Sequence, residues 1–69
     1  MRKLRLNVGL TQEQLAAKVE ITQVYVSKIE NGHIKGLTID TLVKIASCLK
    51  VTPEKLLHVL LSGTNNLNE

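Results

Sequence analysis

Four threonines divide this chain into short segments, and each of them comes directly before a run of residues with helical spacing: Thr11, Thr22, Thr38 and Thr52. Threonine is a favourable N-cap residue because its hydroxyl accepts a hydrogen bond from an unpaired amide in the first helical turn. Glycines stand at the opposite ends of the runs, at positions 9, 32 and 63. The spacing predicts five short helices, at about residues 1–8, 12–19, 23–31, 39–50 and 53–61, and no strand. The expected fold is all-α, a compact five-helix domain.

The size of the chain limits it to one small domain. It has 69 residues, of which 43% are hydrophobic, enough for an aliphatic core but not for a second domain. We assign residues 1–62 to the domain and expect residues 63–69 to form a flexible tail. The lone Cys48 cannot close an intramolecular disulfide, and no apolar run approaches the ~20 residues that span a bilayer. We therefore expect a cytoplasmic protein without membrane contact. The net charge of +3 permits a nucleic-acid partner but does not establish one.

The third predicted helix has two different faces when its side chains are placed about 100° apart. Val26 and Ile29, with Tyr25 beside them, share an apolar arc. The opposite arc has no acidic residue and combines amide, methyl, hydroxyl and ammonium groups, on Gln23, Val24, Ser27 and Lys28. These groups can bond to or pack on base edges in the major groove of DNA. Taken alone, this arc also fits an ordinary solvated surface.

Only the three residues from Glu20 to Thr22 separate the second and third predicted helices. So short a connection forces a tight corner, which is the geometry of a helix-turn-helix. The second helix begins at Thr11 and Gln12, where unpaired amides at the positive end of the helix dipole can hold a phosphate. The two helices together predict a surface that binds DNA.

Two segments carry a longer pattern, GLTQEQLAAKVEITQVYVSKIENG at residues 9–32 and TIDTLVKIASCL at residues 38–49. They resemble the Cro and phage-repressor type of helix-turn-helix domain, the xenobiotic-response-element-like family. The likeness extends from about Arg2 to Leu61. It implies a lambda-repressor-like fold that binds double-stranded operator DNA as a two-fold dimer and regulates transcription. We expect a repressor acting on a palindromic operator.

The resemblance implies roles for individual residues. Gln23, Val24, Ser27 and Lys28 match the base-reading positions of the family, and the helical arc selects the same four residues. Together with Thr11, the residues expected to position phosphates are Gln12, Thr22, Tyr25, His33, Lys35 and Thr38. Within this set, Gln12 is also expected to brace the third predicted helix, which is the recognition helix of the family, and Thr22 is expected to cap it.

An ion pair between Arg5 and Glu30 is expected inside the domain. Arg5 shares one face of the first predicted helix with Met1, Leu4 and Val8, and an unpaired guanidinium there would be costly. Glu30 lies at the edge of the apolar arc of the third helix, and the matching residues of phage-repressor domains form an internal pair. The alternative is two surface charges that extend into solvent.

The chain departs from the family pattern at three places. Glu20 stands where the turn usually has glycine, at a position that tends to be left-handed, so a side chain there either costs ~1 kcal/mol or bends the turn differently. The loop after Asn31 and Gly32 lacks the proline and most of the basic charge often found there. The first helix is also shorter than is typical. Because of these differences, the resemblance predicts the turn between the second and third helices and the phosphate contacts less firmly than the rest of the fold.

The fifth predicted helix has an unusually wide apolar arc. A terminal helix needs an apolar stripe of only roughly 100° to pack on its own core, and this arc is about twice as wide. We therefore expect a homodimer interface at Leu57, Val59, Leu60 and Leu61, with the two recognition helices about 34 Å apart, one turn of DNA. The alternative is a loosely packed apolar terminus.

The sequence shows no constellation of catalytic residues. His33 and His58 are far apart, and neither they nor Cys48 have metal-ligand spacing. We therefore expect no enzyme activity, no metal or other cofactor and no small-molecule ligand. The remaining alternative function is a protein-interaction module of the same fold, such as an antitoxin or an assembly subunit. The salt dependence of binding distinguishes the DNA-binding function from the protein-interaction function, because binding that neutralises phosphates weakens steeply as ionic strength rises.

Overall fold

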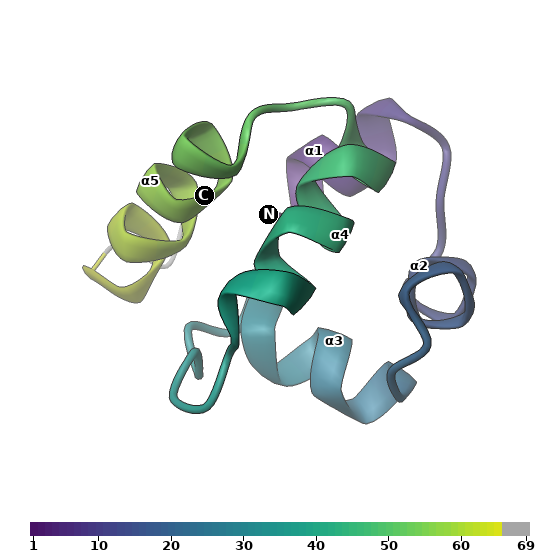
Figure 1. Cartoon of the computed structure of the whole chain (residues 1–69), viewed down its shortest axis with the longest axis horizontal. Coiled ribbons are helices and arrows are strands. Elements are labelled where there is room, and N and C mark those ends of the chain that lie inside the picture. Colours follow the sequence, from purple (N-terminus) through teal and green to yellow (C-terminus); the bar gives the residue numbers. More distant parts are fainter. Residues whose placement is uncertain (66–69) are drawn as a thin grey trace.

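The computed structural model describes residues 1–65, with side chains through Ser62, and contains five helices in that part of the chain (Figure 1). They are α1 (Arg2–Asn7), α2 (Gln12–Val19), α3 (Gln23–Glu30), α4 (Ile39–Leu49) and α5 (Pro53–Asn65). No strand occurs among these residues. The prediction of an all-α, five-helix fold is confirmed.

The predicted threonine caps are present. The Thr11 hydroxyl accepts from the Gln14 amide at 3.0 Å, and the Gln14 side chain accepts from the Thr11 amide at 2.9 Å, which completes a capping box. Thr22, Thr38 and Thr52 each accept from the amide three residues further along, at 3.0–3.1 Å. Local side-chain chemistry therefore fixes where α2 to α5 begin.

The core is built almost entirely from aliphatic side chains. α4 lies between α2 and α5, and α3 packs against both α2 and α5 (Figure 1). The buried apolar residues come from α2 to α5 and from the residue before α1, and they are Met1, Leu15, Ala16, Val19, Val26, Ile29, Leu42, Ile45, Ala46, Leu49, Leu56 and Leu60. This core holds α2 and α3 at a fixed angle on one side of the domain.

The fifth helix differs from the prediction at two points. It continues through Gly63 to Asn65, so Gly63 does not end the helix, and the remainder of the predicted tail, residues 66–69, lies outside the described part. Leu60 is only 2% exposed and packs in the core of its own chain. Its assignment to a dimer interface is therefore wrong, because a side chain that its own core covers has no surface left for a second chain.

Two helices end at a residue with a left-handed backbone that is not glycine. Glu20 after α2 and Lys50 after α4 both have φ of 61°. The left-handed conformation of Glu20 is the one the sequence predicted, while that of Lys50 was not anticipated. Each residue brings its β-carbon close to the following carbonyl oxygen and so carries strain.

Replacing Glu20 by glycine is expected to stabilise the fold by about 0.5–1 kcal/mol, because the relief of left-handed strain exceeds the greater entropy of glycine in the unfolded chain. Urea unfolding monitored by circular dichroism measures the change. Glu20→Ala is the control, since alanine keeps a β-carbon and should give no gain. Equal stability of the two variants would show that the turn is not strained by the side chain.

Candidate nucleic-acid interface

The exposed face of α3 is the face that the helical arc predicted. Val26 and Ile29 are completely buried against the core, whereas Gln23 and Lys28 are exposed and Ser27 is half-buried. Val24 is 65% exposed. The connection from α2 is tight, and the Ile21 amide donates to the Ala16 carbonyl at 2.9 Å. This corner fixes the direction of α3 relative to α2.

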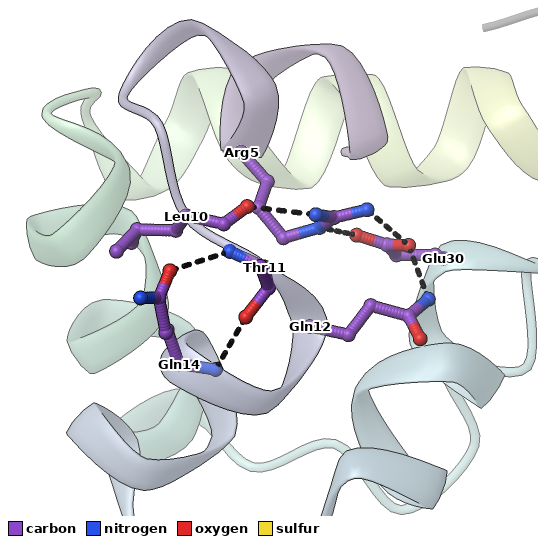
Figure 2. A network of polar contacts seen from close by, with 6 residues as sticks. All are labelled: Arg5, Leu10, Thr11, Gln12, Gln14 and Glu30. Carbon is purple, nitrogen blue, oxygen red and sulfur yellow. Dashed lines mark hydrogen bonds and ion pairs between the residues drawn. The ribbon is translucent and has the colours of Figure 1, made fainter.

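A buried polar network ties the end of α3 to three other segments (Figure 2). Arg5 Nε donates to Glu30 Oε2 at 2.6 Å, and Arg5 Nη2 donates to Glu30 Oε1 at 3.4 Å. Arg5 Nη1 donates to the Leu10 carbonyl at 2.7 Å. The side chains of Arg5 and Glu30 are only 8% and 6% exposed. The expected internal ion pair is thus present, and it joins α1, the connection to α2, and α3.

Gln12 completes this network. Its Nε2 donates to Glu30 Oε1 at 2.8 Å, so the first residue of α2 is bonded to the last residue of α3 (Figure 2). The amide oxygen of Gln12 and the second hydrogen on Nε2 are not used by this bond. The side chain can therefore hold α3 in place and still offer polar atoms to a ligand.

The other residues expected at phosphates fall into two groups. Thr11 and Thr22 are exposed caps at the starts of α2 and α3, and Tyr25, three residues after Thr22, is half-buried. The second group is in and after the loop that follows α3, where Ile34 and Leu37 pack against the core and His33, Lys35 and Thr38 are exposed. The alternation of apolar and polar residues anchors the loop and turns its polar residues to solvent.

A cleft brings part of the first group together with residues that the sequence did not single out. Its lining includes Thr11 and Gln12 from the start of α2 and Gln23 from the start of α3. The lining also contains Arg2, Glu13 and Asn31, together with the Arg5–Glu30 pair. His33, Lys35 and Thr38 are not part of it. Glu13 and Asn31 lie in the segment at residues 9–32 that carries the family pattern, but the pattern assigns them no role. Arg2 reaches the cleft because α1 is joined to α3 by the Arg5–Glu30 pair.

The described residues contain no group of histidine, cysteine and acidic side chains that could hold a metal ion. Cys48 is a free, half-buried thiol. Among the described helices, none has the length and the apolar character that crossing a membrane requires.

Comparisons with known proteins give related results. A family model described as "Helix-turn-helix" matches residues 1–56. The chain is 47% identical over 49 residues to "Putative antitoxin HigA2" of Mycobacterium tuberculosis, a match that covers 71% of this chain but only 48% of that protein. It is 34% identical over 64 residues to "Control protein C.BamHI" of Bacillus amyloliquefaciens, covering 91% of this chain and 78% of that protein. The chain therefore spans about half the length of HigA2. No solved structure gives a significant match.

Proposed function

Because the chain belongs to the helix-turn-helix family of the Cro and C1 type, we propose that it is a sequence-specific regulator of transcription that binds double-stranded DNA. In this proposal it acts as a repressor and binds a palindromic operator as a two-fold dimer. Residues 1–62 form the DNA-binding unit. The observation that carries the proposal is the exposed polar face of α3, held at a fixed angle by α2 and by the network around Glu30.

In this proposal α3 lies in the major groove. Gln23 and Lys28 bond to base edges, Ser27 adds a donor or acceptor, and the methyl groups of Val24 pack on a thymine methyl. The starts of α2 and α3 and the loop before α4 bond to phosphates and set the register, through Thr11, Gln12, Thr22, Tyr25, His33, Lys35 and Thr38. Phosphate contacts of this kind give affinity without sequence preference.

Selection from a library of random duplexes is the experiment that tests the proposal. A palindromic motif would support DNA binding, sequence preference and two-fold symmetry together. The separation of its half-sites would give the distance between the two α3 helices. If no sequence is enriched and the chain binds no duplex at low salt, the proposal is wrong.

The proposed dimer interface uses the part of α5 that its own core leaves exposed. Leu57 is 39% exposed and Leu61 is 49% exposed, and they lie one helical turn apart. Val59 is partly buried on the other side of the buried arc. An apolar stripe of this kind on identical chains can form a self-complementary interface.

Leu57→Lys is expected to reduce the sedimentation mass from that of a dimer to that of a monomer, because a lysine ammonium cannot be buried against a second apolar stripe without a partner. The matched control is Leu6→Lys, since Leu6 is a 56% exposed leucine on α1 and its replacement should leave the mass unchanged. A wild-type chain that sediments as a monomer at high concentration would contradict the proposed interface.

A second candidate function is supported by the likeness to HigA2, a protein whose name describes an antitoxin. In this case the chain would be part of a protein-interaction module, and DNA binding would be secondary. Because the match covers less than half of that relative, it does not favour this function over the first. The salt dependence of binding distinguishes them, since contacts to phosphates weaken steeply with added salt while an apolar protein contact does not.

A further inference from the structure

An asparagine is followed directly by a glycine at the end of α3. Asn31 is exposed, and the function proposed above gives it no role. The backbone nitrogen of a residue that follows asparagine can attack the side-chain Cγ and close a five-membered ring. Glycine has no β-carbon to hinder this approach, so Asn31 and Gly32 form the pair of residue types in which the attack is easiest.

The turn after α3 requires this glycine, so the fold itself keeps the pair together. Gly32 has φ of 90°, in the left-handed region where a β-carbon is strained. The Gly32 amide donates to the Ile29 carbonyl at 3.0 Å, and the His33 amide donates to the Lys28 carbonyl at 2.8 Å. These bonds close the C-terminal end of α3.

The closed helix end holds the reacting atoms apart. The attacking atom is the Gly32 nitrogen, and its hydrogen is bonded to the Ile29 carbonyl. Asn31 has ψ of 10°, which turns the Gly32 nitrogen toward the backbone nitrogen of Asn31 and not toward its side chain. Both features must change before the ring can close. The reaction therefore needs the end of α3 to open, and helix ends open at lower free energy than a core.

Water is the only other reactant that the modification needs. After the Gly32 nitrogen has lost its proton to solvent, it forms a bond to Asn31 Cγ. The bond from Cγ to the side-chain nitrogen breaks, and that nitrogen takes up a proton and leaves as ammonia. One water molecule then opens the cyclic imide at either carbonyl carbon. The products are aspartate, or isoaspartate with a main chain that is longer by one carbon.

Either product introduces a carboxylate where it disturbs the end of α3. Position 31 is next to Glu30 at the negative end of the helix dipole, and it borders the cleft that also contains Gln12 and Gln23. Isoaspartate also lengthens the main chain between the Ile29 carbonyl and the Gly32 amide, so their bond cannot form again in the same geometry.

We propose that Asn31 is a site of spontaneous deamidation, which occurs when the C-terminal end of α3 opens, and that the product destabilises this end and weakens DNA binding. The effect on DNA rests on the proposed function, whereas the modification itself does not. Because the reaction is not reversed by water, it limits the time for which a chain keeps its native α3.

Asn7 is a matched control within the same chain. It is exposed at the end of α1, and the amide of the next residue, Val8, donates to the Arg5 carbonyl at 3.2 Å, three residues back, as the Gly32 amide does at the end of α3. The main difference is the residue that follows, because the β-branched side chain of valine hinders the attack.

The first experiment ages the full chain at neutral and at mildly alkaline pH, folded and in urea, and maps it by trypsin digestion and mass spectrometry. The tryptic peptide of residues 29–35 contains one asparagine, so its mass change is unambiguous. Its deamidated fraction should rise with time, faster at the higher pH and severalfold faster in urea, while Asn7 stays unchanged. If position 31 stays unmodified in the folded chain, or reacts equally fast in folded and unfolded chains, the proposal is overturned.

The second experiment measures the consequence, with thermal melting and with fluorescence anisotropy on a duplex of random sequence. Asn31→Asp should weaken binding about threefold per half-site at low salt and less at high salt, because it adds one negative charge. Asn7→Asp should leave binding unchanged, since the lining of the cleft does not include Asn7. Aged wild type should lose melting temperature and affinity, whereas aged Asn31→Gln should keep the values of the fresh variant.

The outcomes separate this proposal from the proposed function. If aged wild type contains the modified residue but keeps its melting temperature and its affinity, the consequence assigned to Asn31 is wrong and the proposed function stands. If fresh wild type binds no duplex at any salt concentration, the proposed function fails, and the mass and melting measurements still decide whether Asn31 is modified and whether the modification destabilises α3.

Discussion

Arg5→Met is expected to lower the free energy of unfolding by about 3–5 kcal/mol, because it leaves the buried Glu30 carboxylate without a counterion. The carbonyl of Leu10 also loses its donor. A domain of this length has a stability of about 0.05–0.15 kcal/mol per residue. For 69 residues this is roughly 3.5–10 kcal/mol, so the variant should lose a large part of its total stability, and thermal melting followed by circular dichroism measures the loss.

Two further variants identify the cause. Lys44→Ala removes a different ion pair, in which Lys44 Nζ lies 3.4 Å from Asp40 Oδ2 and the side chains are 51% and 79% exposed. Because this pair is in solvent, the substitution should lower the free energy of unfolding by less than about 1 kcal/mol. Replacing Arg5 by methionine and Glu30 by leucine together should recover most of the stability, since no buried charge is then left unpaired. If Arg5→Met is as mild as Lys44→Ala, the pair does not stabilise the fold.

Gln23→Ala is expected to abolish the preference for one or two base pairs in each half-site, at a cost of about 1–3 kcal/mol for the preferred sequence. Gln23 is exposed at the start of α3, where a side chain reaches furthest into the groove in the proposed complex. Selection from random duplexes, carried out in parallel with wild type and variant, measures the preference at each position.

Lys35→Ala is the control for this experiment. Lys35 lies in the loop before α4 and is expected to contact phosphate, so its loss should weaken all sequences equally and leave the selected motif unchanged. A Gln23→Ala variant that selects the same motif as the wild type would show that base reading has been assigned to the wrong residue.

The starts of the helices could be predicted from the sequence because they depend on local chemistry. A threonine hydroxyl and an amide three residues away are enough to define each start, and the structure has these bonds at Thr11, Thr22 and Thr38. The pairing of Arg5 with Glu30 was predictable for a different reason. A guanidinium inside an apolar stripe needs a carboxylate, and the resemblance to phage-repressor domains indicated Glu30 as the partner.

The end of α5 and the use of its apolar face could not be predicted in the same way. The cost of ~1 kcal/mol for glycine inside a helix did not stop α5 at Gly63. The width of the apolar arc on α5 indicated excess apolar surface but not which part of it faces the core, and so Leu60 was misplaced. The left-handed backbone at position 50 could not be predicted, because the residue there is lysine and not glycine.

The surroundings of the recognition face were only partly predictable. The helical arc identified the outward residues of α3, because that depends on one helix. The resemblance indicated that Gln12 braces α3, but the choice of Glu30 as its partner and the grouping of Arg2, Glu13 and Gln23 along one cleft depend on how three helices pack. Single-helix periodicity contains no information about such neighbours.

The network around Glu30 also limits when the chain can fold during translation. Arg5 emerges from the ribosome 25 residues before the carboxylate that neutralises it. Six-residue α1 and eight-residue α2 are both too short to persist as isolated helices in water. The Arg5–Glu30 pair therefore cannot form before α3 has left the ribosome, and α1 and α2 stay marginal as helices until the residues that they pack against have been made.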